Sequence, residues 1–244
     1  MENLKLTMEY DGTAYHGWQV QPGLPTIQGV LEETVKRISG DEVRITGTGR
    51  TDAGVHAMGQ VANFWTKKDL APDAWRRALN GLLPSDIVVQ RVEPAPEGFD
   101  ARRSARHKTY HYTILNTPHP SALERHWVLH ISDPLALASM AEGAAYLIGE
   151  HDFSAFRAAN DNLRNPVRRV YEARFGSEAN YLHLFMTGDG FLKHMIRIIV
   201  GTLLDVGRGK LTPADFQRIL RSKDRQGAGR TAPPHGLCLM HVNY

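Results

Sequence analysis

Residues 47–57, with the sequence GTGRTDAGVHA, combine a carboxylate, a cation and three glycines in one short stretch. Glycine allows backbone conformations that other residues resist, and it lets a ligand approach the main chain closely. Arg50 and Asp52 are two positions apart, so an extended backbone would point both side chains to the same face. The guanidinium can then keep the carboxylate ionised or hold a phosphate. Asp52 is therefore the first candidate for a catalytic residue.

A simpler interpretation of this stretch stays open. Aspartate after threonine is common in turns and at helix N-caps, and glycine-rich turns are frequent. The stretch is not a nucleotide-binding loop, because no Lys-Ser or Lys-Thr follows the glycines and no GxGxxG occurs in the chain. We therefore expect no nucleoside triphosphate cofactor.

Arg197 lies in the run FLKHMIRIIVG, residues 191–201, where apolar residues flank it on nearly every side of an expected helix. A cation in such a place is costly unless it is paired. Asp52 is the one acidic residue that its glycine-rich surroundings already mark as a candidate, so we infer that Arg197 pairs with Asp52. The alternative is an arginine whose side chain extends to the surface.

Tyr110 and Tyr112 alternate with His111 in an expected strand that follows a basic run from Arg102 to Lys108. Residues two apart in a strand share a face. This pattern predicts an aromatic surface beside phosphate-binding cations, an arrangement that stacks unpaired bases. A buried pair of aromatic rings is the alternative for the two tyrosines.

Residues 10–19, with the sequence YDGTAYHGWQ, also combine glycines, aromatic rings and hydrogen-bonding groups. Two interpretations are open for this segment. It could clasp RNA through side chains such as Trp18 and Gln19, or it could be a folded loop that Trp18 packs.

Other common kinds of active site find little support in the sequence. Twelve histidines are present, but no HExxH motif occurs, and the single cysteine, Cys238, excludes a multi-cysteine zinc site. One cysteine also excludes an internal disulfide, which fits a cytosolic location. No GxSxG motif indicates Ser-His-Asp chemistry. We therefore expect no metal site.

The net charge of +3 is unevenly distributed along the 244 residues. Residues 1–100 contain 10 Lys or Arg against 14 Asp or Glu, a balance of −4, and the remaining residues contain 19 against 12, a balance of +7. Basic residues of the second part cluster at 102–108, 164–169 and 218–230. A solvated surface explains most single clusters, but three clusters in one half favour nucleic acid as the partner.

The composition indicates a folded chain without a membrane segment. Hydrophobic residues make up 42% of the sequence, enough for a sizeable core. No apolar run approaches the ~18 uninterrupted residues of a membrane-spanning helix. The first twelve residues are charged and lack the apolar core of a secretory signal.

Hydrophobic patterns predict two consecutive β-α-β-β-α-β units. The first has strands at 4–10, 43–46, 61–65 and 87–92 and helices at 27–38 and 71–83; the second has strands at 108–115, 169–175, 181–187 and 237–242 and helices at 134–148 and 191–206. An extra helix, capped by Thr212-Pro213, runs to residue 220.

This order of elements predicts an α+β fold of two tandem ferredoxin-like halves, each an antiparallel sheet with helices on one face. The join is expected near residues 98–107. It gives an N-terminal half, residues 1–104, that carries Asp52 between its second and third strands, and a basic C-terminal half, residues 105–244.

The motifs GRTDAGVHA, YDGTAYHGWQ and FLKHMIRIIVG, with the segment KTYHY at residues 108–112, together resemble the tRNA pseudouridine synthase A family. The resemblance covers nearly the whole chain. It implies a fold of two ferredoxin-like lobes with the active-site cleft between them, a homodimer, no metal or organic cofactor, and a cytoplasmic enzyme. The implied reaction converts uridines at positions 38, 39 and 40 of the tRNA anticodon stem-loop to pseudouridine.

Roles for individual residues follow from the same resemblance. Asp52 corresponds to the catalytic aspartate, and Arg50 to an arginine associated with flipping the target base. Tyr110 corresponds to the tyrosine that stacks on that base, and Arg197 to the arginine paired with the aspartate. A flipped base needs groups of these kinds to hold it out of the helix.

Two other classes of function stay open at the level of sequence. A non-catalytic RNA-binding module would account for the expected sheets and the basic second half. A nucleoside or glycoside hydrolase would also use Asp52, although such enzymes usually need a second carboxylate nearby and none is close in sequence.

Overall fold

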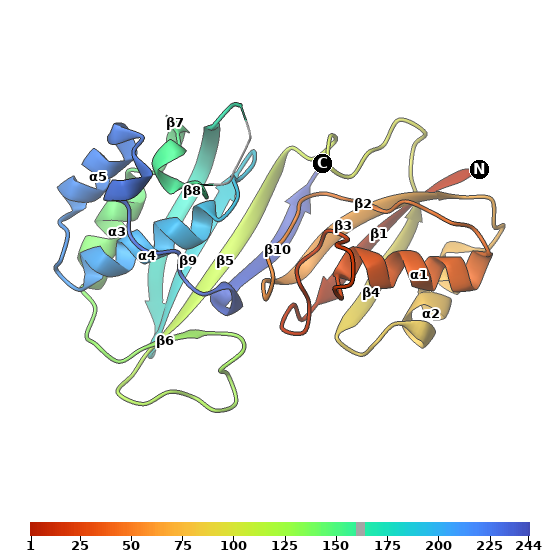
Figure 1. The fold of residues 1–244 in the computed structure, drawn as a ribbon, viewed down its shortest axis with the longest axis horizontal. Helices are drawn as coiled ribbons and strands as arrows, with labels where there is room; N and C mark the ends of the chain where they lie inside the picture. The colour runs from red at the N-terminus through yellow and green to blue at the C-terminus, as the bar shows by residue number, and fades with distance from the viewer. Residues whose placement is uncertain (160–163) are drawn as a thin grey trace. The chain divides into compact units, whose positions relative to one another are not determined.

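The computed structural model describes residues 1–159 and 164–244, and it has the mixed α+β architecture that the sequence predicts (Figure 1). The chain forms two compact units. The first contains Met1–Arg106 together with Cys238–Tyr244, and the second contains His107–Leu237.

The first unit is built on an antiparallel sheet in which β1 is central. β1 pairs with β3 on one side and with β4 on the other, and the short β2 pairs with β3. β10 adds a parallel pairing to β3 through Cys238 and Leu239. The elements are β1 (Glu2–Tyr10), α1 (Ile27–Ser39), β2 (Thr46–Gly47), β3 (His56–Thr66), α2 (Pro72–Leu82), β4 (Ile87–Pro94) and β10 (Leu237–Asn243).

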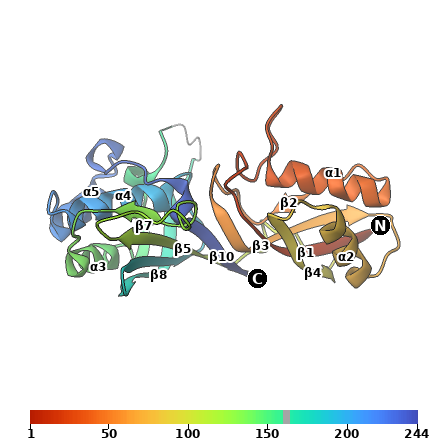
Figure 2. The ribbon, with the colours of Figure 1, turned by 90° about the horizontal axis from the view of Figure 1, so that it is seen from below.

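Local sequence explains both helices of this unit. Thr26 caps α1 by accepting from Gly29 N, and Gly40 ends it in the left-handed conformation with φ 79°. Pro72 begins α2, where its missing N–H costs nothing. Figure 2 shows α1 running alongside the strands of this unit. Trp75 of α2 packs edge-on against Phe64 of β3 in the core, with ring centroids 5.5 Å apart.

The strand expected at residues 43–46 forms only at Thr46–Gly47. Side chains of α1 explain the difference, because Glu32 Oε1 accepts from Ile45 N at 2.9 Å and Gln28 Nε2 donates to Ile45 O at 3.0 Å. These bonds occupy backbone groups that a longer strand would use. The next strand is longer than expected and already begins at His56.

The second unit is a sheet in the order β5-β9-β8-β7, with neighbouring strands antiparallel and β6 added parallel to β5. Its elements are β5 (His107–Asn116), β6 (Leu129–Ile131), α3 (Leu137–Ala145), β7 (Gly149–Asp152), β8 (Val167–Glu178), β9 (Tyr181–Gly188), α4 (Met195–Gly207) and α5 (Pro213–Ser222). The sequence patterns did not predict β6 or β7.

Two helices of this unit show how local chemistry sets their ends. α4 begins at Met195, four residues later than expected, because His194 adopts a left-handed conformation with φ 62°. α5 begins at the predicted Thr212-Pro213 pair, where Thr212 and Asp215 form a reciprocal capping box. Within residues 1–159 and 164–244, no helix is both long and apolar enough to span a membrane.

Candidate active site

Asp52 lies where the sequence places it, in the loop between β2 and β3. We call residues 48–55 the Asp52 loop. Thr51 is buried, whereas its neighbours Arg50 and Asp52 are exposed and half-buried, respectively. The threonine thus anchors the loop inward and leaves the two charged side chains accessible.

The N-terminal segment of residues 11–19 packs directly on the Asp52 loop. Trp18 N donates to Thr51 O at 3.1 Å, and Gly54 N donates to Tyr15 O at 3.3 Å. Gly17 has φ +86°, and a Cβ there would lie 2.5 Å from Thr51 O. The approach of the two backbones therefore requires a glycine at position 17.

Trp18 and Gln19 make contacts inside the first unit. Trp18 is buried and lies against Gly47, where a Cβ would be 2.5 Å from the indole Cε2. Gln19 Nε2 donates to Gln28 Oε1 at 2.7 Å. These contacts favour the folded-loop interpretation for Trp18. A contact of either side chain with substrate stays a prediction.

His56 and Asp11 also border the Asp52 loop, and the sequence analysis did not single them out. His56 Nδ1 accepts from Gly12 N at 3.1 Å and lies 3.1 Å from Asp11 Oδ1. β1 and β3 pair through Tyr10 and Ala57, which brings the next residues, Asp11 and His56, together. The available signal was a polar residue at each strand end: Asp11 directly follows β1, and His56 is the first residue of β3.

Tyr110 and Tyr112 lie on β5 of the second unit, and both side chains are buried. Tyr112 is fully buried and donates its hydroxyl to Pro233 O at 2.8 Å, so the prediction that both rings form an RNA-stacking surface is wrong for Tyr112. Burial raises the pKa of its hydroxyl above the ordinary value. Tyr110 is 8% exposed and packs edge-on against Phe191 with ring centroids 5.3 Å apart.

Arg197 is half-buried on α4 and is held by a neighbouring segment. Its Nε donates to Ala232 O at 2.8 Å, and Ala232 N donates to Arg197 O at 3.0 Å. These two bonds hold the guanidinium of Arg197 and the backbone of Ala232 in place. The predicted pairing of Arg197 with Asp52 joins residues of different units and stays a prediction.

The predicted phosphate-binding residues also fall in different units. Arg102 is exposed in the first unit, in a turn where Asp100 Oδ1 accepts from Arg102 N at 2.9 Å and from Arg103 N at 2.8 Å. Lys108 is half-buried on β5 of the second unit. The first unit thus carries Asp52, Arg50, Trp18, Gln19 and Arg102, and the second carries Lys108, Tyr110 and Arg197.

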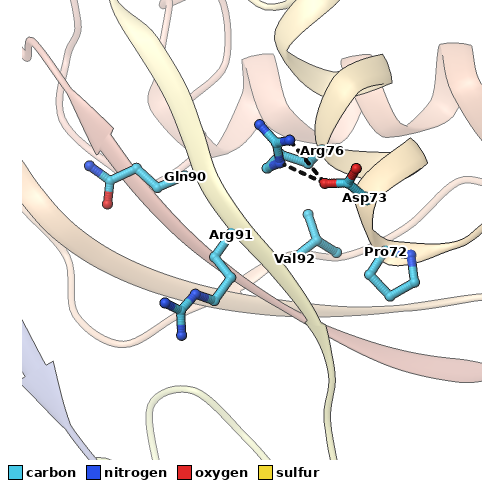
Figure 3. Close-up of a pocket in the computed structure, with 6 residues that line it drawn as sticks. All are labelled: Pro72, Asp73, Arg76, Gln90, Arg91 and Val92. Atoms are coloured by element: carbon cyan, nitrogen blue, oxygen red, sulfur yellow. Dashed lines mark hydrogen bonds and ion pairs between the residues drawn. The ribbon is translucent and has the colours of Figure 1, made fainter.

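None of these residues lines the small hollow in the first unit that Figure 3 shows. Arg76 donates to Asp73 Oδ1 beside it, through Nε at 3.1 Å and Nη2 at 2.9 Å. The lining residues come from α2 and β4: Pro72, Asp73, Arg76, Gln90, Arg91 and Val92. No grouping of three or more His, Cys, Asp or Glu suited to a metal ion occurs among the described residues.

Comparison with known proteins gives a consistent result. Residues 6–102 and 144–244 match the family described as tRNA pseudouridine synthase. The chain is 47% identical to tRNA pseudouridine synthase A of Caldicellulosiruptor bescii, across the full length of both proteins. It is 46% identical to tRNA pseudouridine synthase A of Bacillus subtilis, over 99% of this chain and 98% of that protein.

Proposed function

The chain belongs to the tRNA pseudouridine synthase family, and we propose that it uses Asp52 to isomerise uridines 38, 39 and 40 of the tRNA anticodon stem-loop. As a member of this family it is an isomerase that acts on tRNA uridine. One observation carries the role of Asp52. The carboxylate is accessible on a loop whose adjacent residue, Thr51, is buried and bonded to the N-terminal segment.

The reaction explains why a single carboxylate can be central. The bond from N1 to C1′ breaks, the uracil turns, and C5 forms the new bond to C1′. C5 loses a proton and N1 gains one, so the product is an isomer without net oxidation or hydrolysis. The Asp52 carboxylate can attack the base, attack the sugar, or remove a sugar proton. All three routes need the carboxylate close to the base and ribose of the target uridine.

We assign the other predicted residues to roles around the flipped uridine. Arg50 would hold the target nucleotide out of the stack, and Tyr110 would stack on its uracil. Tyr110 is also a candidate for the proton acceptor that removes the C5 proton. Arg197 would pair with Asp52. Arg102 and Lys108 would bind phosphates, and Trp18 and Gln19 would border the RNA.

The proposal extends to architecture and assembly. The motifs and the order of elements support two ferredoxin-like halves, residues 1–104 and 105–244, with the active site between them. They also support a homodimer, by resemblance to the family. A cytoplasmic location accords with a tRNA substrate.

The first prediction concerns Asp52→Asn, which removes a charge with little change in volume. We expect this variant to lose tritium release from tRNA labelled at uridine C5, while its affinity for tRNA stays measurable. Sequencing for pseudouridine in tRNA treated with wild-type protein should locate the product at positions 38, 39 and 40. Release by Asp52→Asn at the wild-type rate would remove Asp52 from the mechanism, and products elsewhere would overturn the assigned positions.

A further inference from the structure

A buried polar network lies beneath the Asp52 loop, and the proposed mechanism does not use it. Its members are Tyr10, Thr51 and Gln60, which are 3%, 6% and 0% exposed. Tyr10 Oη lies 2.8 Å from Thr51 Oγ1. Gln60 Nε2 donates to Tyr10 Oη at 3.3 Å and to Gly49 O at 3.1 Å. The network therefore reaches the loop at two points, Gly49 and Thr51.

The direction of each hydrogen bond follows from the groups available. Gln60 must present its NH2 group toward Gly49, because two carbonyl oxygens cannot bond to each other. The same NH2 group donates to Tyr10 Oη, so the Tyr10 hydroxyl proton is free to point at Thr51 Oγ1. Burial raises the pKa of Tyr10 above its ordinary value, so the hydroxyl keeps this proton.

The base of the network belongs to the sheet and not to the loop. Tyr10 is the last residue of β1 and pairs with Ala57 of β3 and Ile87 of β4, so strands flank it on both sides. Gln60 lies within β3. Sheet residues at the centre of a unit move little, and groups bonded to them share that rigidity.

The points of attachment lie next to the proposed catalytic residue. Gly49 and Thr51 flank Arg50, and Thr51 directly precedes Asp52. Thr51 is buried, so its fixed position also fixes the backbone of the next residue, Asp52. A carboxylate that attacks a flipped nucleotide must be held accurately, since a misplacement of 1 Å can cost on the order of 100-fold in rate.

We propose that Tyr10 and Gln60 are positioning residues that hold Asp52 in its reactive place through Thr51 and Gly49. This inference rests on the proposed catalytic role of Asp52. The network then affects the chemical step and not tRNA binding, because none of its buried groups can touch the tRNA backbone. Loss of the network should lower kcat and leave tRNA affinity unchanged.

Tyr10→Phe and Thr51→Val test the inference, because each removes one hydroxyl and nearly preserves shape. We expect each to lower the single-turnover rate by about 10- to 100-fold with an unchanged Kd for tRNA. The double variant should be no slower than the slower single variant, because both break the same link. Additive losses would contradict a shared network. If Tyr10→Phe does not fold, Thr51→Val carries the test by itself.

Asn80→Ala is the matched control in the same unit. Asn80 Nδ2 donates to Val89 O at 2.9 Å, and Val89 N donates to Asn80 Oδ1 at 2.8 Å, away from the Asp52 loop. This variant should lower the melting temperature without changing the rate. If Tyr10→Phe behaves in the same way while Asp52→Asn is inactive, the positioning inference fails and the proposed function stands. If Asp52→Asn is active, the proposed function itself fails.

Discussion

His111 Nε2 on β5 lies 2.9 Å from His183 Nδ1 on β9, and the His111 ring stacks on Phe185 with centroids 4.2 Å apart. Burial, and then the nearby His183 and Arg174, lower the pKa of His111 from 6.5 to about 4. The folded protein therefore resists a proton that the unfolded chain accepts. Stability from His111 is fully present above pH 6.5 and is lost as the pH falls towards 4.

Replacing His111 by Phe should make the melting temperature less sensitive to acid between pH 7 and pH 5. The variant keeps an aromatic ring beside Phe185 but has no group to titrate. Thermal melting at several pH values across this range measures the slope of melting temperature against pH. His119→Gln, at an exposed position, should leave the slope of the wild-type protein unchanged. An equally steep slope in His111→Phe would show that other groups cause the acid sensitivity.

Single residues also show what the sequence can and cannot predict about the site. The composition of residues 47–57 was enough to locate Asp52 in a loop between two strands, because glycines and charges mark such loops. Tyr112 was harder, since strand alternation groups residues 110 and 112 on one face without saying which face is buried. The Ala232 partner of Arg197 is 35 positions away, a distance that no local pattern covers.

The helix α4 depends on a close approach that only glycine allows. A Cβ on Gly201 would overlap the carbonyl oxygen of Arg230, whereas Gly81 in α2 has no atom within 4 Å of such a Cβ. Gly81→Ala should therefore stabilise the protein by up to about 1 kcal/mol through helix propensity. Gly201→Ala should destabilise it by about 1 to 3 kcal/mol through overpacking.

Thermal melting of the two glycine variants measures this difference in sign. Gly201→Ala should also slow the reaction, because it displaces residues 229–232 and with them the Ala232 contacts of Arg197. Stabilisation by both substitutions would show that Gly201 is not needed for packing.

Elements differ in how far their own sequence determines them. The long alternating strand β1 and the capped helix α5 were predicted well, because periodicity and the Thr212-Pro213 pair are local signals. The three residues of β6 and the four of β7 are too few to establish a period. Residues 43–45 alternate like a strand, yet side chains of α1 take up the backbone of Ile45.

At the scale of the whole molecule, the order of elements predicted the α+β class but not every pairing between strands. β10 was expected to complete the second half, and it pairs with β3 of the first unit through Cys238 and Leu239. Tyr244, the last residue of the sequence, donates its hydroxyl to Ala101 O at 2.9 Å and lies 2.5 Å from Thr48 Oγ1. Such a return to the first unit depends on contacts between residues distant in sequence.

The uneven charge predicts how affinity for tRNA responds to salt. Arg169 and Arg218, which belong to the basic clusters, pair with Glu150 and Asp215, so not every basic residue of these clusters is available for phosphates. Each phosphate contact should add about 0.7 to 0.9 to the slope of log affinity against log salt concentration. The affinity for tRNA is measured with Asp52→Asn to prevent turnover, and it should fall steeply from 50 to 200 mM salt.

Two variants test whether this salt dependence comes from a defined surface. Lys108→Ala should reduce the slope of log affinity against log salt concentration by about 1, whereas Arg76→Ala, beside the hollow of α2 and β4, should not change it. Equal effects of Lys108→Ala and Arg76→Ala would show that the basic residues act through net charge and not through a defined surface.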